Sequence, residues 1–174
     1  MYNLEDVRSY ILQFQPAGII IDTDVLMLLL VGEYDPSSIE NCKFTNNFCK
    51  ADFECLKKIV SCFNKIIITP HIVAEISNHS TKAFYGDKHY AYFYSLAKFL
   101  EQVEENLCSL KSLLKMDVAI ISAFGFTDMA MFEIAKSSQN KIPILTDDTN
   151  FHIRFRNAIP VIKLSDITKQ TIRF

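Results

Sequence analysis

Short runs rich in isoleucine recur along this chain, and a helical pattern separates most of them. The runs are GIII at 18–21, KIII at 65–68, IPIL at 142–145 and IPVIKL at 159–164. After KIII, Thr69 and Pro70 give a strong helix-start signal, a capping residue followed by proline at the first helical position. Strands and helices that alternate in this way build a sheet covered on both faces. We therefore expect a three-layer α/β/α fold with a mainly parallel central sheet.

The length of 174 residues fits one domain with a substantial core, and 49% hydrophobic and 22% charged residues are ordinary values for such a domain. No uninterrupted apolar run is long enough to cross a membrane, and the N-terminus lacks the order of a secretion signal. The five cysteines are an odd number without a CxxC pair. This pattern favours reduced thiols and a cytoplasmic location, with no membrane partner.

A 3-4 spacing of apolar residues runs through the middle of the chain. Its members are Phe93, Leu96, Leu100, Val103, Leu107, Leu110 and Leu114. The spacing predicts one long helix, and a continuous apolar stripe on such a helix needs a partner surface. We therefore expect a homodimer or a protein partner along the helix at 90–114. The competing interpretation is burial of the stripe within the monomer, against the helix at 50–64 and the N-terminal helix.

Acidic residues follow the strand runs or begin the next helices. They are Asp22 and Asp24 after the first run, Glu75 in the second turn of the helix after KIII, Asp128 at a later helix start, and Asp147 and Asp148 after IPILT. In parallel sheets, ligands bind beyond the carboxyl ends of the strands. We therefore expect these carboxylates to converge there, although each one alone also fits a helix N-terminus or a solvated surface.

Converging carboxylates without a basic partner repel one another, and a hard divalent cation relieves that repulsion. Mg²⁺ and Mn²⁺ take oxygen ligands, keep some of their waters and can bridge to a phosphate. Such a site suits phosphodiester hydrolysis, because the metal activates water and stabilises charge on phosphorus and on the leaving oxygen.

Four segments, IIIDTDVLMLLL, ITPHIVAEI, FTDMAMFEIA and ILTDDTNF, resemble in this order the four acidic motifs of PIN-domain nucleases. That family includes the VapC-type toxins of bacterial toxin–antitoxin pairs, and the resemblance runs from about Gly18 to Leu164. It implies a metal-dependent ribonuclease that acts on single-stranded or structured RNA, and it raises the expectation of an antitoxin-like protein partner. It also implies a single PIN-like domain over 1–174, with helical insertions at about 33–64 and 79–115.

The resemblance also assigns roles to residues of this chain. It places the catalytic roles on Asp22, Glu75, Asp128 and Asp148, and metal binding on these four together with Asp24. Thr146 becomes a polar support for them. The position of Asp24 is more often Asn or Ser in that family, so the additional acid is expected to tighten metal binding or to change its geometry.

Two other functions compete with this one. IIIDTDV also resembles the DxD motif of haloacid-dehalogenase-like phosphatases, in which Asp22 would be the nucleophile and Asp24 the acid/base. A convincing lysine motif is missing between the acids, and Glu75 and Asp128 would have no role in that enzyme. The second alternative is a non-catalytic PIN-like binding module.

The charge of the whole chain is −2, but basic residues are in slight excess in its C-terminal third. A polyanion such as RNA is expected to approach over that third. The candidate RNA-binding residues there are Lys136, Lys141, Arg154, Arg156 and Lys163.

Overall fold

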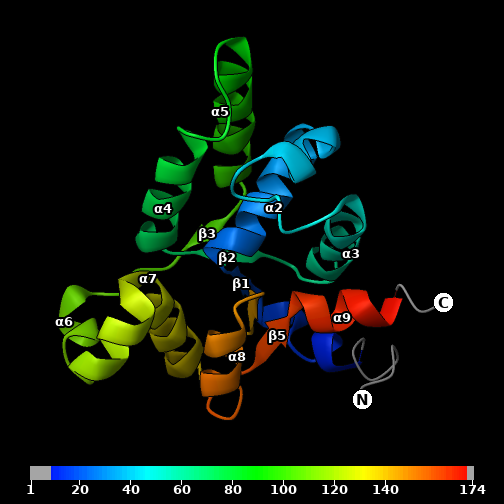
Figure 1. Ribbon diagram of the computed structural model, residues 1–174. Coiled ribbons are helices and arrows are strands. Elements are labelled where there is room, and N and C mark those ends of the chain that lie inside the picture. Colours follow the sequence, from blue (N-terminus) through cyan, green and yellow to red (C-terminus); the bar gives the residue numbers. More distant parts are fainter. Residues whose placement is uncertain (1–8, 172–174) are drawn as a thin grey trace.

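The computed structural model describes residues 9–171, and these form a parallel sheet between two layers of helices (Figure 1). The strands are β1 (Ile19–Ile21), β2 (Ile66–Ile68), β3 (Glu104–Glu105), β4 (Ile144–Thr146) and β5 (Val161–Lys163). Within the described part of the chain, the sheet has five strands in the order β3-β2-β1-β4-β5. Every neighbouring pair is parallel, which confirms the expected three-layer α/β fold.

The helices divide between the two sides of this sheet. In Figure 1 the upper layer holds α2 (Thr23–Tyr34), α3 (Lys50–Val60), α4 (Pro70–Ser80) and α5 (Asp87–Leu100). The lower layer holds α6 (Leu110–Leu113), α7 (Val118–Ser137) and α8 (Thr149–Phe155). The last helix, α9 (Leu164–Thr171), follows β5 and packs against α3. Two short 3₁₀ helices, η1 (Gln15–Ala17) and η2 (Pro36–Asn41), lie in the connections.

The path of the chain through the sheet reverses at β1. From β1 the chain adds β2 and β3 on one side, and it then returns to add β4 and β5 on the other side. β1 and β4 are direct neighbours, with Ile20 opposite Ile144 and Ile21 opposite Leu145. Where the strand order reverses, consecutive connections leave in opposite directions and open a crevice at the carboxyl ends of the strands. This topology therefore places a binding crevice beyond Ile21 and Leu145.

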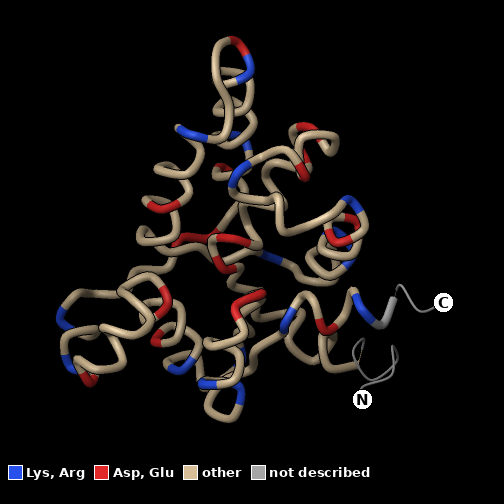
Figure 2. The backbone as a smooth tube through the Cα atoms, viewed as in Figure 1, with Lys and Arg blue, Asp and Glu red and all other residues tan. Residues whose placement is uncertain are grey.

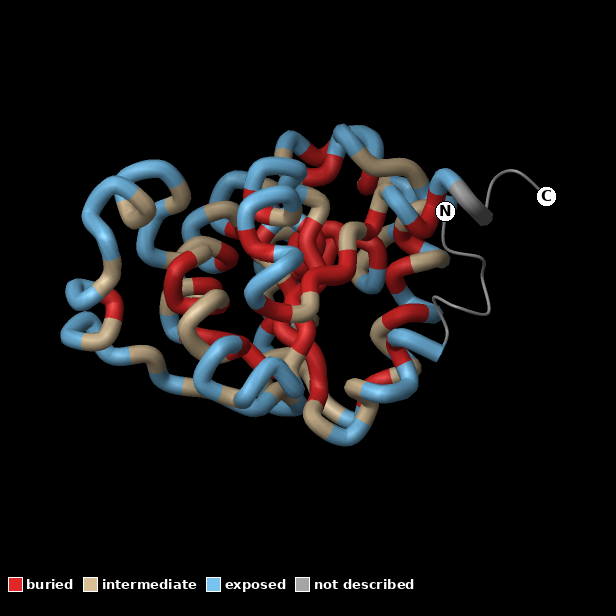
Figure 3. Tube along the Cα trace, turned by 90° about the horizontal axis from the view of Figure 1, so that it is seen from below, coloured by how far each residue is buried: buried red, intermediate tan, exposed pale blue. Residues whose placement is uncertain are grey.

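The core is centred on the sheet and on α2, and exposed segments surround it (Figure 3). α2 is buried along most of its length, from Val25 to Gly32, because it packs against η2, α3, α4 and α5. Gly32, a residue type that often ends a helix, lies inside α2. A β-carbon built on Gly32 would stand 2.4 Å from a ring carbon of Phe53 in α3. The absence of a side chain at Gly32 therefore lets α3 pack closely on α2.

Replacing Gly32 by Ala should destabilise the fold by about 1–2 kcal/mol, because overpacking outweighs the helix propensity of alanine. The Phe53 ring is buried and has to move to admit the new methyl group. Urea denaturation measures the change. Adding Phe53→Leu to Gly32→Ala should cost less than the two single changes together, because the smaller side chain leaves room. Strict additivity would show that the two residues do not compete for space.

The expectation of one long helix across the apolar spacing at 93–114 is wrong. α5 ends at Leu100, and Glu104 and Glu105 then pair with β2 as strand β3, so the insertion expected at 79–115 is not wholly helical. Asn106 continues this edge by donating its N–H to the carbonyl of Ile68 at 2.8 Å. Backbone pairing along the open edge of β2 thus replaces helical hydrogen bonds.

The late members of the apolar spacing do not share a buried face, since Leu107 and Leu114 are 75% and 66% exposed. The structural basis of the expected homodimer along 90–114 is therefore absent, and the oligomeric state stays untested.

α7 has a sharp backbone break at Gly125, where φ is 83° and ψ is 173°. Such a positive φ suits glycine, because it lacks the β-carbon that makes this conformation costly.

By length and composition alone, α7 is apolar enough to cross a membrane. The sequence contains no uninterrupted apolar run of that length, so this helix was not expected to qualify. A core helix passes the same test, and Met129, Met131 and Ala135 of α7 are buried in the core.

Candidate metal and nuclease site

Asp22 ends the first strand and caps α2, so it lies in the crevice at the point of strand reversal. Its Oδ1 accepts a hydrogen bond from the backbone N–H of Thr23 at 2.6 Å. Its Oδ2 accepts one from the Thr146 hydroxyl of β4, also at 2.6 Å. Thr146 is completely buried, and its oxygen accepts the backbone N–H of Asp148 at 2.9 Å. One hydroxyl group therefore joins the first and the last acids of the sequence pattern, in the supporting role expected for Thr146.

Asp148 caps α8 through one carboxylate oxygen, as its position in the sequence indicated. Its Oδ1 accepts the backbone N–H groups of Asn150 and Phe151 at 2.6 and 3.0 Å. Within residues 9–171 its other oxygen accepts no hydrogen bond and is open to another ligand. Asp147 differs in role, because its Oδ1 accepts the backbone N–H of Ser165 at 2.9 Å and so fixes the start of α9.

Glu75 reaches the same crevice from α4, and the link is Thr23. The Thr23 hydroxyl donates to Glu75 Oε2 at 2.7 Å, while the Thr23 backbone N–H holds Asp22. Thr23 is buried, and sequence reasoning gave it no role. The position of Thr23 between Asp22 and Asp24 was the only feature of the sequence that could have indicated this role. The start of α4 is as expected, with the Thr69 hydroxyl accepting the N–H of Ile72 and Pro70 at the first helical position.

Asp128 lies in the first turn after the break at Gly125, between the exposed Phe126 and the buried Met129. Within residues 9–171 its carboxylate accepts no hydrogen bond, in contrast to Asp22 and Asp148. Its pKa is raised from 3.8 to about 8, first by burial and then by the negative charges of the other acids. A new helical segment therefore begins after the backbone break, and its first turn places Asp128 near the other acids. Asp128 keeps its proton more strongly than an ordinary carboxyl.

The four acids that raise the pKa of Asp128 define, together with it, the acid cluster: Asp22, Asp24, Glu75, Asp128 and Asp148. The pKa of Asp22 is raised to about 6, chiefly by burial and also by the charges of Asp24 and Asp148, while the hydrogen bonds from Thr146 and Thr23 oppose the rise. Burial also raises the pKa of Asp24, with contributions from Glu75 and Asp148. The residues that sequence reasoning selected are therefore close enough to repel one another. Figure 2 shows acidic segments from separate parts of the chain meeting near the middle of the fold.

His79 is a further group beside the acid cluster, and sequence reasoning missed it. Its charge opposes the rise in the pKa of Asp24. It lies on α4 four residues after Glu75, a spacing that puts both on one side of the helix. The His79 ring stacks on Phe44 at 4.3 Å between ring centroids, and its Nδ1 is buried without a hydrogen-bond partner. η2 and the loop after it, which carries Phe44, therefore help to position a side chain next to the acids.

The donor set of the acid cluster fits a hard divalent cation. Within residues 9–171 no Lys or Arg forms an ion pair with any of its five members. In the same part of the chain, no three His, Cys, Asp or Glu side chains form a ready-made cage around one ion. Mg²⁺ usually keeps several waters and takes only one or two carboxylates, so its binding does not need such a cage. The arrangement therefore suits Mg²⁺ or Mn²⁺ better than a metal that needs a closed protein cage.

Two of the five expected RNA-binding residues line one cavity, and the other three do not line it. Lys136 lies over the Phe132 ring, with its nitrogen 5.7 Å from the centroid. Lys141 and Arg154 are exposed. Arg156 and Lys163 instead line one cavity, and Lys163 Nζ donates to the Thr149 hydroxyl at 2.7 Å, next to Asp148. The structure thus separates two members of this group from the other three.

Comparison with known proteins adds no relative. No family model matches this sequence, and no curated protein is significantly similar to it.

Replacing Thr146 by Val should lower RNA cleavage by about 10- to 100-fold, the usual effect of removing a group that orients a metal-binding residue. Valine has the same shape but leaves the Asp22 carboxylate and the Asp148 N–H without their shared partner. Thr146→Ser keeps the hydroxyl and should retain most of the activity. Steady-state cleavage of a labelled single-stranded RNA measures both variants. Equal activity of the Val variant and the wild type would show that this hydroxyl does not support the site.

Proposed function

We propose that this protein is a divalent-metal-dependent ribonuclease of the PIN type. One observation supports this proposal most directly: acids from three other segments add to the rise in the pKa of Asp128. Within residues 9–171 no Arg or Lys forms an ion pair with any of these acids. The order of the four acidic motifs, which resembles that of PIN-domain nucleases, favours RNA as the substrate. The same order places the catalytic roles on Asp22, Glu75, Asp128 and Asp148.

Asp22, Asp24, Glu75, Asp128 and Asp148 would hold Mg²⁺ or Mn²⁺ in this enzyme. The chemistry that such an ion supplies when bound is water activation and stabilisation of charge on the phosphodiester. Asp22 cannot rotate freely, because both of its oxygens accept hydrogen bonds from the protein. Thr23 fixes Glu75 relative to Asp22. The chain therefore orients two of its carboxylates before any substrate arrives, which lowers the cost of assembling the reacting groups.

A haloacid-dehalogenase-like phosphatase is the competing enzyme. That mechanism gives no role to Glu75 or Asp128, although both act electrostatically within the same cluster as Asp22. It also requires a lysine beside the nucleophile, and within residues 9–171 none is paired with Asp22. These observations favour the nuclease over the phosphatase.

The test is a cleavage assay with purified protein. Labelled single-stranded RNA should be cut in the presence of Mn²⁺ or Mg²⁺. Cleavage should stop when EDTA is added and return when the metal is restored in excess. A phosphomonoester substrate in the same buffers should not be hydrolysed. Hydrolysis of the monoester without RNA cleavage would support the phosphatase, and RNA cleavage that resists EDTA would contradict a metal-dependent mechanism.

A further inference from the structure

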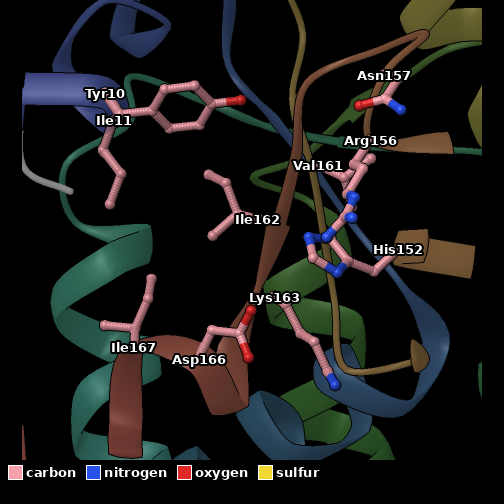
Figure 4. Close-up of a pocket in the computed structure, with 10 residues that line it drawn as sticks. All are labelled: Tyr10, Ile11, His152, Arg156, Asn157, Val161, Ile162, Lys163, Asp166 and Ile167. Carbon is pink, nitrogen blue, oxygen red and sulfur yellow. The ribbon is translucent and has the colours of Figure 1, made fainter. Parts of the chain in front are cut away.

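A cavity of about 430 Å³ lies beside the acid cluster, between β5, α8, α9 and the N-terminal residues 10 and 11. Figure 4 shows Arg156, His152 and Lys163 together along one wall. Tyr10 and Ile11 form the opposite wall, and Ile162 lies between the two. The size of this cavity is within the range of small-ligand sites, and its lining combines apolar side chains with polar and charged ones.

The charges along this wall favour an anion. Arg156 and Lys163 are cationic, and within residues 9–171 neither is neutralised by an ion pair. Burial lowers the pKa of His152, and the two cations lower it further, while Asp166 opposes them. Arg156, Lys163 and Asp166 therefore all act on His152 across a shared space. Asp166 is the one acid of the cavity lining, and a lone carboxylate beside cations is suited to accept a hydrogen bond from a sugar hydroxyl.

The cavity and the acid cluster share one structural element. Asp148 of the cluster caps α8, and His152 of the cavity donates its backbone N–H to the Asp148 carbonyl at 3.0 Å. Lys163 of the cavity bonds to Thr149, the first residue of α8. The lining of the cavity is therefore connected to the acid cluster through Asp148 and Thr149.

We propose that this cavity binds a nucleotide, with its phosphate at Arg156 and Lys163 and its base against Tyr10 and Ile162. The inference rests on the proposed ribonuclease function where the nucleotide belongs to RNA. The same chemistry would hold a free mononucleotide, and the test separates these two sources. An aromatic side chain and a cationic group together are the usual elements of single-strand binding. A cavity of this kind would fix the register of the strand relative to the acids.

The matched pair of variants is Arg156→Ala and Arg154→Ala. Both arginines are exposed at the end of α8, but only Arg156 lines the cavity. Each change is made in an Asp22→Asn background, and binding of a short labelled single-stranded RNA is measured by fluorescence polarisation in EDTA. We expect Arg156→Ala to weaken binding about tenfold or more, the effect of losing a charged hydrogen-bond donor to phosphate. Arg154→Ala should change binding less than threefold, as an exposed charge does.

Adenosine 5′-monophosphate, adenosine and inorganic phosphate serve as separate probes in calorimetry with the same variants. Monophosphate binding that depends on Arg156 supports a site that also accepts a free nucleotide. RNA binding that depends on Arg156, without monophosphate binding, supports a subsite of the RNA substrate only. Equal weakening of RNA binding by both arginine changes, or no binding of RNA and of the three small probes alike, would overturn the inference. Because these measurements need no cleavage, equal RNA affinity of the two variants, in a protein whose wild type cuts RNA, would refute the cavity site alone.

Discussion

Replacing Asp22 by Asn should reduce RNA cleavage by about a thousandfold or more, which corresponds to about 4 kcal/mol of transition-state stabilisation. Asp22 lies at the centre of the proposed site, because it connects to Thr146 of β4 and, through Thr23, to Glu75 of α4. Asparagine is neutral and a much weaker ligand for a hard cation than a carboxylate. The loss should therefore appear in metal-dependent turnover, measured as kcat/KM on labelled single-stranded RNA.

The fold of the Asp22→Asn variant should survive. Asparagine is as good a helix cap as aspartate, so it can still accept the Thr23 N–H. Its amide can donate to the Thr146 hydroxyl, which is able to accept as well as donate. Asp117→Asn is the matched control, because Asp117 also caps a helix by accepting a backbone N–H but lies outside the acid cluster. Full metal-dependent cleavage by Asp22→Asn would contradict its assigned role, and loss in the Asp117 variant would point to a general folding defect.

Replacing Asp128 by Asn should stabilise the metal-free protein, and the gain should increase with pH. The pKa of Asp128 is raised in the folded state, from 3.8 to about 8. Folding therefore loses stability as the pH rises from about 4 to about 8, since the unfolded chain ionises freely over this range. Above pH 8 the folded wild type bears the whole free-energy cost of the ionised Asp128 carboxylate, and the variant has no such charge. Because Asp128 is only partly buried, solvent screens part of this cost. We therefore expect the free energy of unfolding to increase by about 3 kcal/mol in the Asp128→Asn variant.

Thermal unfolding in EDTA at several pH values measures this effect. A gain of about 3 kcal/mol raises the melting temperature of a domain of this size by roughly 6–12 °C. The gain should shrink towards acidic pH, where Asp128 of the wild type is already protonated. Glu133→Gln is the control, a similar change on the same helix outside the acid cluster. Mn²⁺ should stabilise the wild type more than the Asp128 variant. A gain that is independent of pH would show that charge repulsion is not its cause.

The isoleucine runs were enough to predict the central strands, because a buried parallel strand needs little more than a short β-branched run. Thr69 with Pro70, and Asp148, marked their helix starts correctly, since capping depends on side chains a few residues away. The five members of the acid cluster could be selected before the structure was known. Each follows a strand or begins a helix, and parallel strands bring those positions to one edge.

The apolar spacing at 93–114 failed because a local pattern competes with pairing partners that are distant in sequence. Glu104 and Glu105 have little strand propensity, and they form β3 because the edge of β2 offers free backbone groups beside them. The sequence analysis expected Thr146 to support the acids without indicating which of them it joins, and it gave Thr23 no role. Thr146 bonds Asp22 across 124 positions of the chain, and Thr23 bonds Glu75 across 52.

The sequence alone determined the strand and helix alternation and the identity of the acids, because both depend on local side-chain chemistry and on the fixed geometry of parallel sheets. The tertiary structure decided which groups orient those acids, how strongly burial and repulsion change their pKa values, and that Arg156 and Lys163 share a cavity while Arg154 does not. These properties depend on distances between segments that are far apart in the chain. Desolvation and Coulomb repulsion exist only once folding has brought the segments together and removed water from between them.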